Sequence, residues 1–359
     1  IKTSGVKLLS GVITALPHPL SLLAKTSGKD TITLGANTFQ DKTEAVKLKY
    51  DDRVTHVNLI GRSRDGKSNL IHHMIHQDIQ NGKGVGLIDP HGSLVNAVLA
   101  SSIPADRVQD VILLDVSDKD FPFGLNLLSP ERGVPIETHA AFVVAVLRKV
   151  FGEIWSAGRM EDVIYASVIS LLAYPGSTIQ DIPRLLLNPQ FRAMVVKKVR
   201  DPVARDFWRD EFEPRTDAVK LQIAQPVNSR LRRLFRDPDL RRILCQRGSL
   251  DFREMLDQNT IFLANLGGMA EVEAETIGAL LMAKIQMAAM SRGQQPEPVF
   301  YFYIDEVQNF VTTSLAKILS EAQIRVEYGD CQPVSETTGR GYPGCCVRQR
   351  GHLDYFPSG

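Results

Sequence analysis

A hydrophobic strand, a glycine-bounded loop and a helix are expected in succession across residues 56–75, which read HVNLIGRSRDGKSNLIHHMI. The loop has the spacing G-x4-G-K-S. In loops of this kind, backbone N–H groups and the following helix N-terminus surround phosphates, the lysine reaches the β- and γ-phosphates, and the serine hydroxyl binds Mg²⁺. The strand–loop–helix context favours this interpretation over a chance turn. We therefore predict an ATP site contacted by Gly61, Arg62, Ser63, Arg64, Asp65, Gly66, Lys67, Ser68 and Asn69.

A second motif supplies the acids that such a phosphate site needs. The segment VFYFYIDEVQNF has six bulky apolar residues followed by Asp305 and Glu306, which indicates a buried central strand with a polar tip at the ligand-binding edge of a sheet. We predict that Asp305 completes the Mg²⁺ shell and that Glu306 polarises the attacking water, with Lys67 as the other catalytic residue. The alternative is that the two acids only end a strand and open a helix.

The middle of the glycine-bounded loop is unusual, because Arg64 and Asp65 stand where small residues are expected. Asp65 adds negative charge near the predicted phosphates, and Arg64 adds bulk where the backbone must approach them closely. Arg62 or Arg64 offers a compensating positive charge. We expect nucleotide binding to survive but to be weaker than with an Arg64→Gly, Asp65→Thr loop, which a labelled-ATP titration tests.

Weaker signals lie at two other strand ends. LIDPHG places Asp89 and His91 at a strand tip, near the nucleotide or a neighbouring subunit, or else in a turn without chemistry. Asn265 in NLGG either senses the γ-phosphate or ends a strand. His72 and His76 have i, i+4 spacing but no zincin-type acidic partner, so they predict only a helix surface. The arginines of RLRRLFRDPDLRR favour a solvated or ion-paired helix face over a DNA contact.

Composition sets limits on the function. The chain has 359 residues, 23% of them charged, and a net charge of +1, so any nucleic-acid contact must be local. Its four cysteines form no CxxC pair and indicate neither a disulfide framework nor a zinc site. The early apolar stretch is broken by Pro17 and Pro19 and fits neither a membrane span nor a signal peptide. Because the chain begins at Ile1, we expect it to be a piece of a longer protein.

The pattern along the chain predicts an α/β core interrupted by helices. Apolar runs joined by helical segments indicate a parallel sheet, and the amphipathic segments between them indicate a helical insertion. We predict a β-rich lead-in over 1–50, a first core segment over 51–134, an all-helical insertion over 135–250, a second core segment over 251–325, and an irregular tail over 326–359.

Many separate motifs in one order resemble a known family. DRVTHVNLIGRSRDGKS, GLIDPHGSLV, FGLNLL, FWRDEF, IFLANLGG, LLMAKIQMAAMSR and YFYIDEVQNF resemble the TraG/TraD-type conjugative coupling ATPases, in the HerA–FtsK branch of P-loop motors, over about residues 32–322. The resemblance implies a RecA-like domain with a helical insertion that forms a hexamer around DNA. It further implies Lys67 and Ser68 for nucleotide and Mg²⁺, Asp305 for the metal and Glu306 as catalytic carboxylate. Implied partners are a relaxase, type IV secretion channel components and the inner face of the cell membrane, reached through an N-terminal anchor.

The tail departs from this resemblance after about Ala322. The family would continue into another strand with a polar sensor, whereas QIRVEYGDCQPV has no core periodicity, which would leave a sheet edge unpaired. Codons chosen for Glu327 to Gln332 and read one nucleotide later give Asn-Met-Val-Ile-Ala-Asn, which is family-like. We interpret this as a frameshift near Gln323, which the underlying DNA sequence would test.

Three functions therefore stay open at the level of sequence. The first is an ATP-driven DNA-translocating motor of a conjugation or type IV secretion apparatus. The second is a secretion-channel assembly ATPase that acts on protein. The third is a remnant that binds nucleotide without efficient turnover, because the tail lacks the expected γ-phosphate sensor and arginine finger.

Overall fold

The computed structural model describes residues 30–39, 42–54, 57–60, 66–151, 158–292, 298–306, 325–330, 344–349 and 352–357. Its centre is an eight-stranded sheet with the order β10-β9-β3-β8-β7-β4-β6-β5. All strands from β3 to β5 in that order run parallel to their neighbours, whereas β9 pairs antiparallel with both β3 and β10. The strands are β3 (Val57–Ile60), β4 (Gly84–Asp89), β5 (Val111–Asp115), β6 (Ile261–Asn265), β7 (Phe300–Ile304), β8 (Arg325–Asp330), β9 (Gly344–Gln349) and β10 (His352–Pro357).

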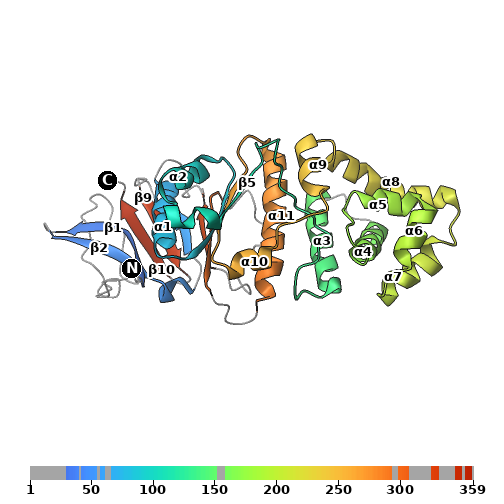
Figure 1. Ribbon diagram of the computed structural model, residues 1–359, viewed down its shortest axis with the longest axis horizontal. Coiled ribbons are helices and arrows are strands. Elements are labelled where there is room, and N and C mark those ends of the chain that lie inside the picture. Colours follow the sequence, from blue (N-terminus) through green and yellow to red (C-terminus); the bar gives the residue numbers. More distant parts are fainter. Residues whose placement is uncertain are drawn as a thin grey trace, which may run out of the picture.

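Strands β4, β6 and β7 form where the sequence has apolar runs. Every residue of β4, β6 and β7 is buried, as expected for parallel strands that are covered on both faces. Two helices, α1 (Lys67–Gln80) and α2 (Ser93–Ser101), cover one face and share a core with the lead-in strands (Figure 1). These lead-in strands, β1 (Thr31–Phe39) and β2 (Lys42–Lys49), form a separate antiparallel pair.

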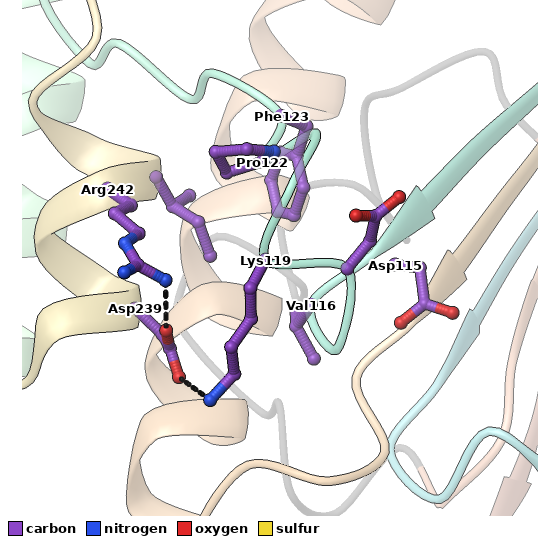
Figure 2. Close-up of a pocket in the computed structure, with 9 residues that line it drawn as sticks. Asp115, Val116, Lys119, Pro122, Phe123, Asp239 and Arg242 are labelled. Carbon is purple, nitrogen blue, oxygen red and sulfur yellow. Dashed lines mark hydrogen bonds and ion pairs between the residues drawn. The ribbon is translucent and has the colours of Figure 1, made fainter.

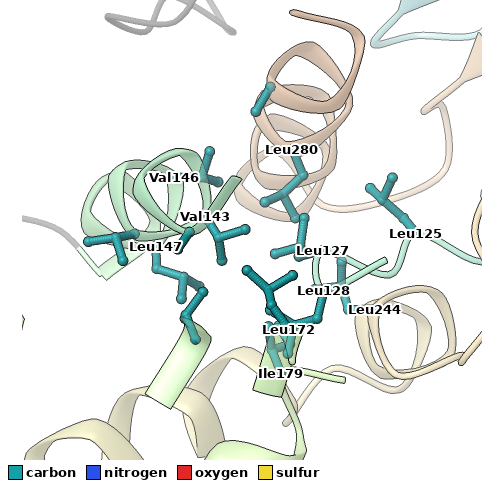
Figure 3. Close-up of a cluster of buried hydrophobic side chains, with 14 of the residues drawn as sticks. Leu125, Leu127, Leu128, Val143, Val146, Leu147, Leu172, Ile179, Leu244 and Leu280 are labelled. Carbon is teal, nitrogen blue, oxygen red and sulfur yellow. The ribbon is translucent and has the colours of Figure 1, made fainter. Parts of the chain in front are cut away.

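The opposite face of the sheet is covered by α10 (Phe252–Asp257) and α11 (Glu271–Met290), which lie between the sheet and the insertion in Figure 1. Almost all of α11 is buried, from Ile277 to Ala289. A helix that is apolar all round must be covered on all sides, and here the insertion provides the second cover. Figure 3 shows Leu280 of α11 among leucines and valines from the insertion and from the loop around Leu127.

The insertion lies between β5 and β6, and its described regular elements are all helices. Its helices are α3 (Ile136–Phe151), α4 (Gly158–Leu172), α5 (Asp181–Leu187), α6 (Pro189–Val196), α7 (Pro202–Asp206), the π-helix η4 (Phe207–Phe212), α8 (Asp217–Leu234) and α9 (Pro238–Leu244). Three of them begin at an Asn-Pro or Asp-Pro pair, in which the side chain accepts a backbone N–H bond and proline takes the first helical position. The capping residues are Asn188, Asp201 and Asp237.

The tail differs from the irregular segment that we expected over 326–359. β8 lies between β3 and β7 and is parallel to both, and β9 and β10 extend the sheet beyond β3. β3 is therefore paired on both sides rather than left at an open edge. The sequence pattern did not reveal these strands, because RVEYGD, GCCVRQ and HLDYFP lack the unbroken apolar runs that identify β4, β6 and β7. Among the described residues, no helix combines the length and apolarity needed for a membrane crossing.

Candidate active site

The start of α1 carries the described portion of the predicted phosphate-binding motif. Gly66 has a φ of 87° and ψ of 10°, a left-handed conformation that would cost other L-residues about 1–2 kcal/mol. Lys67 is the first helical residue and is 6% exposed, whereas Ser68 and Asn69 are exposed. Residues 61–65, which hold the predicted contacts of Gly61, Arg62, Ser63, Arg64 and Asp65, lie outside the described residues.

The end of β7 brings the acidic pair to the same edge of the sheet. The residue before the pair, Ile304, is in register with Ile88 of β4, and the backbone N–H of Asp305 donates to the carbonyl of Ile88 at 3.1 Å. Asp305 is 7% exposed. It lies at the carboxyl end of a central strand, which is where parallel α/β sheets bind ligands.

Ser68 and Asp305 are in direct contact. The Ser68 hydroxyl donates to Oδ2 of Asp305 at 2.9 Å, which joins the start of α1 to the end of β7. Burial raises the pKa of Asp305 above its ordinary value; the bond from Ser68 opposes this, and the negative charges of Asp89 and Glu306 add to the rise. A buried carboxylate that is surrounded by other acids favours a cation beside it.

This donor set fits Mg²⁺ bound together with nucleotide phosphates. Magnesium takes oxygen ligands and is usually held by one or two carboxylates plus phosphates and water rather than by an all-protein cage. Ser68 and Asp305 offer a hydroxyl and a carboxylate. Within the portion of the chain that the structure describes, no group of three or more His, Cys, Asp and Glu residues could hold a metal ion alone.

Glu306 follows Asp305 in an uncommon conformation. Its φ is 51°, in the left-handed region that residues other than glycine rarely occupy. Its backbone N–H donates to Oδ1 of Asp305 at 3.1 Å, and its Oε2 lies 2.9 Å from Nε2 of His91. The sequence indicated that His91 lies at a strand tip but gave no sign that it contacts Glu306.

The other two strand-tip residues have structural partners. Asp89 is fully buried and caps α2, with Oδ2 accepting the backbone N–H groups of Leu94 and Val95 at 2.7 and 3.1 Å. Asn265 donates to Asp115 at 3.0 Å and accepts from the N–H of Gly267 at 2.9 Å. Its amide thus serves a strand-ending turn here, which was one of the two alternatives.

A buried polar network behind the site was not anticipated from the sequence. Arg53 binds both carboxylate oxygens of Asp78 in α1 at 2.8 and 2.9 Å, and both side chains are fully buried. Tyr303 in β7 donates to Asp78 at 2.6 Å and accepts from Arg53 at 2.9 Å. Tyr303 and Asp305 are two residues apart, so they point to the same face of the sheet, toward α1. The network therefore fixes α1 and β7, which carry Ser68 and Asp305, relative to each other.

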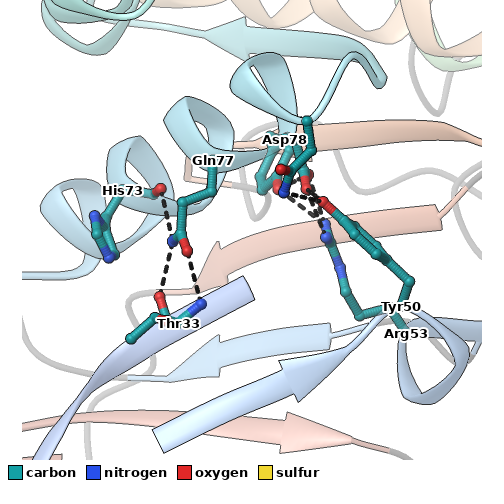
Figure 4. Close-up of polar contacts among 8 residues, drawn as sticks. Thr33, Tyr50, Arg53, His73, Gln77 and Asp78 are labelled. Atoms are coloured by element: carbon teal, nitrogen blue, oxygen red, sulfur yellow. Dashed lines mark hydrogen bonds and ion pairs between the residues drawn. The ribbon is translucent and has the colours of Figure 1, made fainter. Parts of the chain in front are cut away.

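The lead-in strands are fastened to the same helix. Figure 4 shows Gln77 of α1 bonded to Thr33 of β1, with its Oε1 accepting at 2.7 Å and its Nε2 donating at 2.8 Å. Tyr50, which follows β2, donates to Asp78 at 2.8 Å in the same view. The lead-in strands and Tyr50 thus hold α1 through contacts that lie outside the eight-stranded sheet.

His72 and His76 also have partners within the fold. Nε2 of His72 and Nδ1 of His76 each lie 3.2 Å from the hydroxyl of Ser102, which follows α2. They connect α1 with α2 and are not simply a solvated helix surface.

A shallow pocket lies at the end of β5, beside α9 (Figure 2). Asp239 there pairs with Lys119 at 3.7 Å and with Arg242 at 3.5 Å, while Asp115 is engaged by Asn265 and by Ser117. Arg242 belongs to the arginine-rich segment and is ion-paired, as predicted for that helix face. The charged groups of this pocket are thus partnered within the chain.

Comparisons with known proteins bear on the fold. No protein-family model and no curated protein sequence matches the chain. Among solved structures, the bacterial conjugative coupling protein TrwBdeltaN70 in its unbound form has a TM-score of 0.56 at 14% identity, covering 85% of this chain and 66% of that one. TrwB with the ATP analogue ADPNP has a TM-score of 0.54 at 15% identity, covering 85% and 68%. TrwB with ADP and Mg²⁺ has a TM-score of 0.51 at 15% identity, covering 79% and 65%.

These likenesses concern architecture, and the chain spans just under two thirds of the TrwBdeltaN70 chain. They confirm the predicted fold class, a mainly parallel α/β sheet of the RecA-like P-loop type with a helical insertion and short N-terminal strands. The resemblance to TraG/TraD-type coupling proteins holds at the level of the fold: this chain is built on the architecture of the TrwB conjugative coupling proteins.

Proposed function

We propose that this protein is an ATP-hydrolysing motor that moves DNA in a conjugative or type IV secretion apparatus. The observation that carries the proposal is the hydrogen bond between Ser68 and Asp305. It brings together the Gly-Lys-Ser turn and the acidic end of a central strand, which are 237 residues apart in sequence and are the two halves of the proposed ATP site. The fold shared with TrwB, which has been solved with ADPNP and with ADP and Mg²⁺, supports the same assignment.

Each residue has a role that follows from its chemistry. Lys67 would neutralise the β- and γ-phosphates, while the hydroxyl of Ser68 and the carboxylate of Asp305 would hold Mg²⁺. The ion, when bound, neutralises charge that develops on the phosphates. Glu306 would orient and polarise the attacking water. Gly61, Arg62, Ser63, Arg64, Asp65, Gly66 and Asn69 complete the proposed nucleotide contacts.

The motor's wider setting also belongs to the proposal. We place it as a hexamer around DNA, at the inner face of the cell membrane, working with a relaxase and secretion-channel components. Hexamer formation would allow an arginine from one subunit to complete the site of the next, a contribution that can reach several kcal/mol at the transition state.

DNA-stimulated ATP hydrolysis by the chain tests the proposal. Wild type, Lys67→Ala and Glu306→Gln are compared with and without single- and double-stranded DNA. We expect turnover that rises with DNA and falls in both variants by about a hundredfold or more. A rate of ATP hydrolysis that DNA does not change but that a secretion-channel protein increases would favour the assembly ATPase. ATP binding with no Glu306-dependent turnover in a folded hexamer would instead leave a nucleotide-binding remnant.

A further inference from the structure

The carboxylate proposed to activate water is held by a histidine from a different strand end. Nε2 of His91 lies 2.9 Å from Oε2 of Glu306, although the two residues are 215 positions apart in sequence. An ionised carboxylate can only accept hydrogen bonds, so Nε2 must carry the proton in this contact. The side chains of His91 and Glu306 are 64% and 29% exposed, respectively. The contact therefore lies at the solvent-exposed carboxyl end of the strands and not in the core.

The turn that carries His91 is fixed in position. The backbone N–H of His91 donates to Oδ1 of the buried Asp89 at 2.9 Å. Gly92 follows with a φ of 79°, and a Cβ there would lie 2.2 Å from Oδ1 of Asn265. A Cβ on Gly267 would similarly lie 2.5 Å from the carbonyl oxygen of His91. The two turns that end β4 and β6 therefore pack so closely that neither Gly92 nor Gly267 has room for a side chain. This packing fixes the backbone position from which the His91 side chain extends.

The residue that His91 contacts is itself set apart by its backbone. Glu306 has a φ of 51°, a conformation that is costly for a side chain of this size and that persists only where neighbours hold it. The preceding residue, Asp305, is held against β4 by the hydrogen bond from its backbone N–H to the carbonyl of Ile88. His91 and Glu306 are thus both placed by the ends of the paired strands β4 and β7. A carboxylate bound at Oε2 has the direction of its Oε1 restricted as well.

We propose that His91 is a positioning residue for Glu306, and this inference rests on the proposed ATP hydrolysis. By binding Oε2, the imidazole holds the carboxylate in the orientation that the attacking water requires. Its proposed role is to hold Glu306 and not to bind the nucleotide itself. Because a pair this exposed contributes little to folding, its main effect is on turnover and not on stability or nucleotide affinity.

Kinetics of the full chain separate this role from a structural one. We expect His91→Ala to lower kcat about tenfold or more, since small misplacements of a catalytic group are costly. KM for ATP and the affinity for a non-hydrolysable analogue should stay within about twofold. His91→Gln, which keeps a donor of similar reach, should recover most of the loss. In a Glu306→Gln background, adding His91→Ala should cause no further loss. His73→Ala on the exposed face of α1 is the matched histidine control.

A spectroscopic measurement tests the contact without turnover. In ¹⁵N-labelled chain, the imidazole signals assigned through His91→Ala should show the proton on Nε2, and they should shift in Glu306→Gln while those of His73 do not. Glu306-dependent turnover that His91→Ala leaves intact would overturn this inference alone. So would unshifted His91 signals in Glu306→Gln. If the contact is seen but wild type shows no Glu306-dependent turnover, the proposed function falls and the inference falls with it.

Discussion

The hydroxyl of Ser68 donates a 2.9 Å hydrogen bond to Asp305 across 237 residues of sequence. Ser68 lies in the first turn of α1, and Asp305 directly follows β7. The bond therefore depends on the packing of α1 against the face of the sheet toward which Asp305 points. The bond places the Ser68 hydroxyl and the Asp305 carboxylate, the two proposed Mg²⁺ ligands, side by side.

The first prediction concerns the metal dependence of nucleotide binding. Ser68→Ala removes one of the two proposed Mg²⁺ ligands, so affinity for Mg-ATP should fall about tenfold, or ~1.4 kcal/mol. Affinity for ATP in the presence of a chelator should change little, because Lys67 remains. Fluorescent-nucleotide titrations with and without Mg²⁺ measure both. Ser229→Ala, at an exposed serine of α8, is the matched control; an equal loss with and without Mg²⁺ would refute the metal role.

The second prediction concerns the stability of the ligand-free protein. Because burial and the charges of Asp89 and Glu306 raise the pKa of Asp305, the folded state binds its proton more tightly than the unfolded state. Stability from this group is therefore lost as pH rises from its ordinary pKa through the raised one. At pH 8, Asp305→Asn should unfold at higher denaturant than wild type, and the difference should shrink on acidification.

Ligand should reverse that order. Mg-ATP should raise the unfolding midpoint of wild type and have much less effect on Asp305→Asn, since the variant lacks the carboxylate that is proposed to bind Mg²⁺. Chemical denaturation at pH 8 and pH 5, with and without Mg-ATP, gives all the comparisons. A ligand-free Asp305→Asn variant that is less stable than wild type at pH 8 would contradict the electrostatic argument.

The third prediction concerns the buried network of Arg53, Asp78 and Tyr303. Asp78→Asn leaves the Arg53 charge buried without its carboxylate and should cost about 3–5 kcal/mol of unfolding free energy. Tyr303→Phe keeps the ion pair and should cost only about 1–2 kcal/mol. Urea denaturation measures both. Glu161→Gln, which breaks the exposed pair with Arg148, should cost less than ~1 kcal/mol; a similar cost for Asp78→Asn would show that the buried pair contributes no more than a surface one.

What the sequence could predict here was local. The apolar run before Asp305 and the glycine spacing before Lys67 each define a strand–turn unit, and the parallel-sheet rule then places both at one edge. Asp78 could not be recognised, because one acid in an amphipathic helix looks solvated until Arg53 and Tyr303 are brought to it from 25 and 225 residues away. The contact between His91 and Glu306 was hidden for the same reason. β8 was missed because its sequence, RVEYGD, lacks the unbroken apolar run that marks β4, β6 and β7.

The last prediction concerns the junction between the sheet and the insertion. His139 in α3 is 1% exposed, its Nε2 lies 2.8 Å from the carbonyl of Leu127, and its Nδ1 has no hydrogen-bond partner among the described residues. Burial, with the nearby Lys284 ammonium, lowers the pKa of His139 to about 4. Lys284 is itself buried in α11, where it pairs with Glu131 and donates to the carbonyl of Ser129 at 3.0 Å. The imidazole is thus held neutral beside a buried cation.

A lowered histidine pKa makes the unfolded state the better proton acceptor. The contribution of neutral His139 to the free energy of unfolding is fully present above the ordinary pKa near 6.5, and it is lost as pH falls toward about 4. Between pH 7 and 4.5, wild type should therefore lose about 2–3 kcal/mol more than His139→Gln, which keeps a donor for Leu127 but does not titrate. Titration of Glu131, whose pKa burial raises, is common to both proteins and cancels in the difference. Urea denaturation of wild type and of His139→Gln between pH 7 and 4.5 measures this difference in unfolding free energy. Parallel pH profiles of the two proteins would mean that His139 already accepts a proton in the folded protein.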